Sequence, residues 1–192
     1  MGTQLTRIKN SLCLQHSRVL LLGFLIIAFS ACTDSASGPD ITEGFEGGWA
    51  LNNWSQSGIL GGTTSMSGSA EQLSMIYNVD LGNPGGGVSQ RTAIFSIVVP
   101  ESGIVEFDWL WTGFHAFFRA NGELSVKSES ETIELQNEGA ASSFEFMGST
   151  SIEVTEGETL EIEVGGSNFD SNSRLRGEVS LTNFTVTPAS DS

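Results

Sequence analysis

The sequence predicts an all-β domain, built as a two-sheet antiparallel β-sandwich of the jelly-roll type and preceded by a signal peptide. Beyond Cys32 no segment places apolar residues at a convincing helical spacing. Short runs instead alternate apolar with polar residues, and Gly, Asn, Ser and Pro interrupt them, which is typical of a sandwich or barrel. The absence of a repeat of roughly 20–50 residues favours a jelly roll over a propeller.

The N-terminal segment 1–31 has the pattern of a secretory signal peptide. Arg7, Lys9 and Arg18 precede an apolar run of thirteen residues at 19–31, which ends in small residues. A membrane-spanning helix is the alternative, but it needs roughly 20 apolar residues. The segment is therefore expected to direct export and not to belong to the folded domain.

A lipid anchor is predicted at the end of this segment. Residues 29–32, Phe-Ser-Ala-Cys, resemble the lipobox of bacterial lipoproteins, with Phe in the place usually held by Leu. The resemblance implies that Cys32 becomes the first residue and that its acyl chains attach the protein to a membrane. Thr33 stands where inner-membrane lipoproteins carry Asp, which favours the outer membrane of a bacterial cell envelope. The alternative is that Cys32 is an ordinary residue after a signal cut, and the side of the membrane that the domain faces stays open.

The composition beyond the anchor limits the possible partners. Residues 32–40 read as a flexible tether, 41–188 as one folded domain and 189–192 as a disordered tail. From Cys32 onward the chain has 23 acidic and five basic residues, a formal charge of −18. Such a surface repels nucleic acid, so nucleic acid is not an expected partner. No further cysteine follows Cys32, so packing, with or without a metal, must stabilise the domain.

The first predicted strands are 72–79, 91–99 and 104–112. The run 91–99 is almost continuously apolar, which predicts a central strand covered on both faces. In 104–112, residues of one parity are large and apolar and face inward, whereas Glu106 and Asp108 face solvent. The inward set is Val105, Phe107, Trp109 and Trp111.

The second half of the chain continues this scheme. A hairpin is predicted at Asn121-Gly122, between runs 114–120 and 123–127, because both turn residues accept positive φ. The apolar parity changes along the last strand, which predicts a β-bulge near Thr182-Asn183. Outward glutamates in the later runs oppose edge-to-edge aggregation. The inward residues of those runs are Ile133, Leu135, Phe144, Phe146, Ile152, Val154, Leu160, Ile162 and Val164.

Four short motifs lie apart from one another in the predicted domain. They are Gly44-Phe45-Glu46-Gly47-Gly48-Trp49, Val105-Glu106-Phe107-Asp108-Trp109, Gly157-Glu158-Thr159-Leu160 and Leu181-Thr182-Asn183-Phe184. Together they resemble the strands and turns of carbohydrate-binding jelly rolls and MAM-like exported domains. The resemblance implies a possible structural calcium held by Glu46, with Asn183 near the place of a second ligand. The alternative is a buried or capping carboxylate at Glu46.

A polar loop supplies a further candidate ligand. Asp170 alternates with Asn168 and Asn172 in this loop, and these side chains suit calcium or sugar hydroxyls. The alternative is that they only shape turns. No cofactor is certain from the sequence.

Catalytic residues are sparse. His115 is the only histidine beyond the signal segment, and neither a Gly-x-Ser-x-Gly elbow nor a cysteine nucleophile accompanies it. Glu106 and Asp108 lie two residues apart on one strand, roughly 6.6 Å at the backbone. Inverting glycosidases separate their carboxyl groups by about 6.5–9.5 Å. Any acidic strand face produces this spacing, so the domain is predicted not to be an enzyme, and a glycosidase is the third hypothesis.

Aromatic side chains are the better candidates for a binding site. Trp54 lies outside the alternating pattern, between Asn53 and Gln56, whose polar groups suit sugar hydroxyls. We expect Trp54 to form an exposed platform, with Trp49 and Tyr77 as further ligand-binding residues. The alternative is a Trp54 side chain folded over the end of the sandwich.

The function predicted from the sequence is a non-catalytic domain at the cell envelope that binds glycan or extracellular matrix. The second hypothesis is a structural or assembly module that binds another envelope protein.

Overall fold

The computed structural model describes residues 40–59, 63–80, 91–115, 121–139, 143–167 and 174–189. The predicted signal peptide, Cys32 and nearly all of the tether lie outside the described residues. In the part that is described, no helix is long and apolar enough to cross a membrane.

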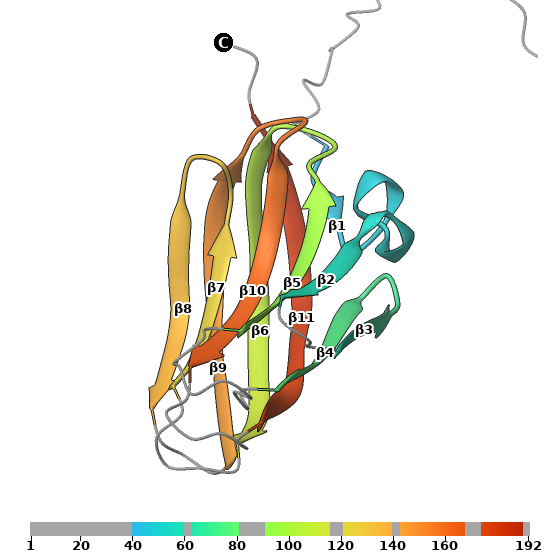
Figure 1. Cartoon of the computed structure of the whole chain (residues 1–192). Coiled ribbons are helices and arrows are strands. Elements are labelled where there is room, and N and C mark those ends of the chain that lie inside the picture. Colours follow the sequence, from blue (N-terminus) through green and yellow to red (C-terminus); the bar gives the residue numbers. More distant parts are fainter. Residues whose placement is uncertain are drawn as a thin grey trace, which may run out of the picture. The chain divides into compact units, whose positions relative to one another are not determined.

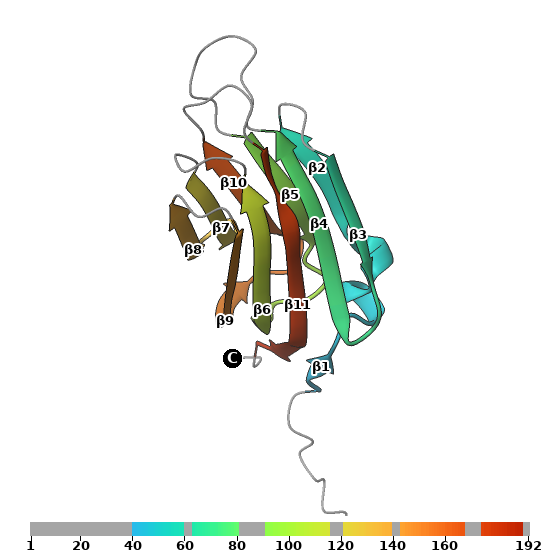
Figure 2. The same ribbon diagram turned by 90° about the horizontal axis from the view of Figure 1, so that it is seen from below.

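Eleven described strands form two antiparallel sheets stacked face to face (Figures 1 and 2). The six-stranded sheet has the order β3-β4-β11-β6-β9, with β1 paired to β11, and the five-stranded sheet has the order β2-β5-β10-β7-β8. The strands of the first sheet are β1 (Thr42–Glu43), β3 (Thr63–Gly68), β4 (Gln72–Asp80), β6 (Gly103–His115), β9 (Ser143–Val154) and β11 (Arg174–Pro188). Those of the second are β2 (Ser55–Ile59), β5 (Arg91–Val98), β7 (Asn121–Lys127), β8 (Thr132–Gly139) and β10 (Thr159–Ser167). Two short 3-10 helices, η1 (Gly47–Trp49) and η2 (Leu51–Asn53), connect β1 to β2.

The strand order is that of a jelly roll. The last eight strands divide into β4-β11-β6-β9 and β5-β10-β7-β8, and most consecutive strands cross from one sheet to the other. β3 and β2 extend the two sheets along the same side. Each sheet has one apolar face, and stacking the two faces removes both from water. The predicted two-sheet antiparallel β-sandwich is confirmed.

Alternation along β6 places the core between the sheets. Val105, Phe107, Trp109 and Trp111 are all buried, while Glu106 is exposed on the opposite face. The prediction for this strand is confirmed. In β9 and β10 the inward residues Ile152, Val154, Leu160, Ile162 and Val164 are buried as expected. Ile133, Leu135, Phe144 and Phe146 lie nearer the side of the sandwich, where they are partly buried and pack against the core.

The β5 prediction is half right. The strand lies between β2 and β10 inside its sheet. Its outer face, however, is not covered: Val98 is 64% exposed and Ile94 is only partly buried. An antiparallel sandwich leaves one face of each sheet to solvent, so an apolar run on a central strand does not require two covered faces.

The predicted hairpin at Asn121-Gly122 is wrong. Both residues belong to β7, where they pair with Ser167 and Gly166 of β10. β6 and β7 also lie in different sheets and do not pair with each other. The Asn-Gly preference for a tight turn is local, and the pairing of β7 with both β8 and β10 overrides it.

The predicted irregularity in the last strand is confirmed. The pairing of β11 with β6 shifts register between Thr182 and Thr185, and Asn183 adopts a positive φ of 51°. The extra residue lets Leu181 and Phe184 both point into the core although their parities differ.

Candidate functional site

The structure does not present Trp54 as an exposed platform. Its side chain is 6% exposed, and its indole N–H donates to the carbonyl of Trp49 at 3.1 Å. The ring packs edge-on against Phe45, with centroids 6.3 Å apart. The prediction of an exposed Trp54 is therefore wrong, and its alternative, a Trp folded over the end of the sandwich, is what the fold contains. Burial of such a large ring stabilises the domain, and the polar residues beside Trp54 in the sequence do not prevent this burial.

The other predicted aromatic ligands are also inside. Trp49 and Tyr77 are each 1% exposed. The Tyr77 hydroxyl accepts the indole N–H of Trp111 at 2.7 Å and donates to the carbonyl of Thr112 at 3.4 Å. Burial raises the pKa of Tyr77 above its ordinary value, and the Trp111 hydrogen bond offsets part of this rise. Neither ring offers a face to a ligand.

The predicted polar ligands, Asn53 and Gln56, are exposed, but none of the predicted aromatic residues is exposed beside them. Asn53 donates through its side-chain amide to the carbonyls of Gly47 and Gly48, so it supports the η1 turn. Gln56 is exposed on β2, an edge strand of the second sheet. The five residues predicted to bind ligand therefore do not form one exposed site.

Two of the three predicted metal ligands lie together. Glu46 and Asn183 line one depression of about 460 Å³, with Glu43 and Glu71 also on its wall. The side-chain amide of Asn183 already donates to Asp108 at 2.7 Å. No group of three or more Asp, Glu, His or Cys side chains converges as a metal site within the described residues. Asp170 lies outside those residues, so the described part does not by itself make up the calcium site, which stays a prediction.

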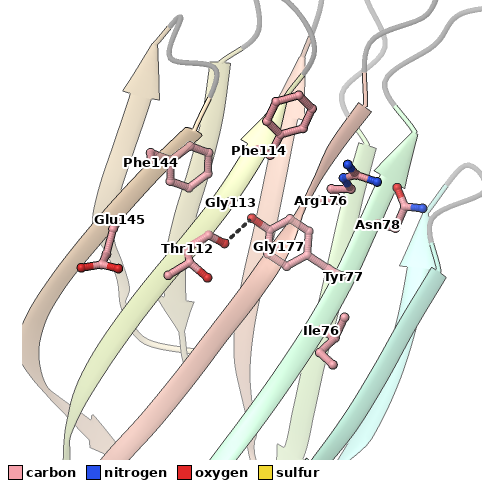
Figure 3. A pocket seen from close by; sticks show the side chains of 10 residues that line it. All are labelled: Ile76, Tyr77, Asn78, Thr112, Gly113, Phe114, Phe144, Glu145, Arg176 and Gly177. Carbon is pink, nitrogen blue, oxygen red and sulfur yellow. Dashed lines mark hydrogen bonds between the residues drawn. The ribbon is translucent and has the colours of Figure 1, made fainter.

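The outer face of the six-stranded sheet carries a shallow groove of about 540 Å³ (Figure 3). It crosses β4, β11, β6 and β9, which are consecutive neighbours in the sheet, and β9 is the edge strand. Six of its residues occupy outward positions by alternation along their strands: Ile76, Asn78, Thr112, Phe114, Glu145 and Arg176. The remaining lining residues, Tyr77, Gly113, Phe144 and Gly177, occupy the inward positions between them.

Two glycines form the floor of the groove. Gly177 lies opposite both Tyr77 and Gly113, and Gly113 lies opposite Phe144. A Cβ on Gly177 would fall 1.9 Å from the Thr112 carbonyl oxygen, and one on Gly113 would fall 2.2 Å from the Phe144 ring. The absent side chains let the Tyr77 and Phe144 rings close against the backbone from the inside.

A cation lies over an aromatic ring at one wall of the groove. Arg176 and Phe114 are direct partners in the pairing of β11 with β6, and the guanidinium carbon lies 5.3 Å from the ring centroid. Phe114 remains 38% exposed. On the other side of Arg176, its β4 partner Asn78 has a buried side-chain oxygen with no hydrogen-bond partner. The wall therefore combines a partly open ring, a guanidinium and an unsatisfied amide oxygen.

The groove lies at one end of the sandwich and the start of the domain at the other. Arg176 stands near the beginning of β11, whereas β1 pairs with Val186 near the end of that strand. Ten residues of extended chain separate these positions, which corresponds to roughly 30 Å. Figure 1 shows β1 and the end of β11 at the same end of the sandwich.

The carboxylate pair considered for glycosidase chemistry lies elsewhere on this face. Asp108 accepts hydrogen bonds from the Ser149 hydroxyl and then from the Asn183 amide, and both lower its pKa. A general acid needs a raised pKa instead. Neither Asp108 nor Glu106 lines any of the described depressions.

Sequence reasoning missed the groove, although one signal was present. Phe114 shares the parity of Glu106 and Asp108, so the alternation that places those carboxylates outward also places an aromatic ring outward. The parity of Arg176 in β11 indicates the same, because it is opposite to that of Val179. Which strands are neighbours could not be read from the sequence, and the groove depends on that order.

Comparison with known proteins gives structural neighbours only. No protein-family model matches the chain, and no curated protein matches it. A family 11 carbohydrate-binding module from Clostridium thermocellum, solved with a mixed-linked tetrasaccharide, has 12% identity and a TM-score of 0.33 over 81% of this chain and 98% of its own. A xylan-binding domain from Paenibacillus barcinonensis has 12% identity and a TM-score of 0.34 over 82% of this chain and 100% of its own. Likenesses at this level carry no argument about the ligand of this chain.

Proposed function

We propose that this chain is a non-catalytic glycan-binding module of the bacterial cell envelope, and that its ligand lies across the groove on the six-stranded sheet. The observation that supports the proposal most is the wall formed by Phe114, Arg176 and Asn78. A partly exposed ring beside fixed hydrogen-bonding groups is the usual composition of a small-molecule site. The groove volume of about 540 Å³ also falls in the range of such sites.

Each group has a role that suits a sugar. The Phe114 ring offers an apolar surface to the C–H face of a pyranose. Asn78, Thr112 and Glu145 supply acceptors and donors for hydroxyl groups around that ring.

The proposed anchor would hold the domain close to a membrane. Acylation of Cys32 would attach the chain, and residues 32–40 would connect it to the domain. Incorporation of labelled palmitate into the wild-type chain but not into Cys32→Ser tests this anchoring, and equal labelling would refute it.

Binding to a panel of neutral polysaccharides tests the groove. Affinity electrophoresis or calorimetry with the full chain should identify at least one ligand, and Phe114→Ala should weaken its binding about tenfold, the effect of losing roughly 1.4 kcal/mol. Met147→Ala is the matched control, because Met147 is 70% exposed on the same face of the sheet but does not line the groove. Equal loss in both variants, or no binding to any polysaccharide, would refute the proposal.

A structural or assembly module is the second candidate, and one observation favours it. β9 is an edge strand of twelve residues, and its central outward side chain, Met147, is 70% exposed. An open strand edge with an apolar side chain can pair with a partner protein. Cross-linking in intact cells separates the candidates: a single protein partner that is lost in Met147→Glu, with glycan binding absent, would favour assembly.

A further inference from the structure

Arg176 has no carboxylate partner among the described side chains, although the domain is strongly acidic. Among the side chains that the structure describes, the other cation is Lys127, which forms an ion pair with Glu163 on the second sheet. No described carboxylate lies within ion-pair distance of Arg176, and its guanidinium lies over the Phe114 ring instead. An arginine left unpaired among so many acids is available to an anion from outside.

The reason why Arg176 stays unpaired is visible on its own strand. Glu178 lies two residues further along β11 and therefore on the same face. Its carboxylate oxygen accepts the hydroxyls of Ser180, at 3.2 Å, and of Ser74. Ser74 and Ser180 pair directly across β4 and β11, one step further from Arg176. The two serines therefore hold the Glu178 carboxylate on the side away from the guanidinium.

The ring contact also orients the guanidinium. The Phe114 ring centroid lies 5.3 Å from its central carbon, and this cation–π contact restrains the group while its N–H groups have no described hydrogen-bond acceptor. An arginine held in this way presents parallel N–H donors, a geometry that matches the two oxygens of a carboxylate. A lysine at this position would offer a point charge without that match.

From this arrangement we infer that the groove recognises a sugar that carries a carboxylate, a uronic acid, and that Arg176 is its partner. The inference rests on the proposed function and names its ligand class. The formal charge of −18 from Cys32 onward disfavours a densely charged polymer. Glu145, on the wall of the same groove, repels anionic groups, and Arg176 can offset this repulsion for only one of them. The ligand is therefore an isolated uronic acid within an otherwise neutral chain.

A matched pair of polymers tests the inference. The probes are glucuronoxylan and the same polymer after reduction of its carboxylates to alcohols, measured by calorimetry with the full chain. The wild type should bind glucuronoxylan at least about tenfold more tightly than the reduced polymer, because only the carboxylate form can make a hydrogen-bonded charge pair with Arg176. Arg176→Gln should remove the difference, and Arg176→Lys should retain only part of it. Lys127→Gln, which removes one charge from the other sheet, should leave the difference unchanged.

Each outcome decides one question. Equal binding of both polymers by the wild type would overturn the uronic acid and leave the glycan-binding proposal standing. Binding of neither polymer nor of any neutral polysaccharide would overturn both. Stronger binding of a densely sulfated polysaccharide than of glucuronoxylan would overturn the choice of carboxylate. The wild-type comparison decides the inference even if a variant fails to fold, which thermal unfolding would detect.

Discussion

Trp54→Ala separates a packing role of this side chain from a binding role. Trp54 is 6% exposed and closes one end of the sandwich beside Phe45, Trp49 and Phe184. Its indole N–H also satisfies the carbonyl of Trp49. Alanine would leave a cavity in this aromatic cluster and would remove that hydrogen bond.

The expected loss of stability is large. Truncation of a buried Trp or Phe to Ala costs about 3–5 kcal/mol, and this value already includes typical lost contacts. A domain of this size has a total stability of roughly 5–15 kcal/mol, so the variant should retain a folded state with a small margin. Trp54→Phe keeps most of the ring volume and should lose less than half as much free energy.

Urea unfolding followed by circular dichroism measures these differences at 25 °C. Val98→Ala is the surface control, because Val98 is 64% exposed, and it should change the free energy of unfolding by no more than about 0.5 kcal/mol. Polysaccharide binding of Trp54→Ala, measured without denaturant, should equal that of the wild type. A Trp54→Ala variant that keeps its full stability but loses binding would refute the argument and restore the exposed platform.

Two further predictions concern carboxylates outside the groove. Glu158, 8% exposed, accepts the backbone N–H groups of Thr155 at 2.6 Å and Glu129 at 3.1 Å and so connects two turns. Glu158→Ala should lower the free energy of unfolding, measured with urea, by about 2–4 kcal/mol. Glu156→Ala on the same turn is the control and should change it by under about 0.5 kcal/mol. Similar losses in both variants would refute this role of Glu158. Asp108 has a lowered pKa in the folded state, so its stabilising effect is present at neutral pH and is lost as the pH falls from the ordinary pKa of an aspartate through this lower folded-state pKa. An NMR titration of its carboxyl carbon should show that Ser149→Ala raises this pKa, and an unchanged midpoint would contradict the assigned cause.

The strands and their faces were predictable because burial acts residue by residue along an extended chain. Trp109 and Trp111 lie inward and Glu106 outward, as period-two alternation requires. The parity change before Phe184 likewise predicted the bulge at Asn183. In both cases the information lies within a few consecutive residues.

Properties that depend on partners distant in the sequence were not predictable in this way. Asn121-Gly122 favours a turn locally, but pairing with β10 makes it part of a strand. Trp54 has polar neighbours in the chain, yet it is buried in an aromatic cluster with Phe45, Trp49 and Phe184, and Phe184 lies 130 positions further along the chain. Local composition therefore misassigned both residues.

The all-β class, the inward and outward faces of most strands and the acidic character could be predicted from the amino-acid sequence, since each follows from local alternation or from composition. Which strands are neighbours became known only from the folded domain. That order sets Phe114, Arg176 and Asn78 side by side on three strands, although Asn78 and Arg176 lie 98 positions apart in the chain. A binding surface on a jelly roll is made across strands, and cross-strand pairing depends on the packing of the whole sandwich.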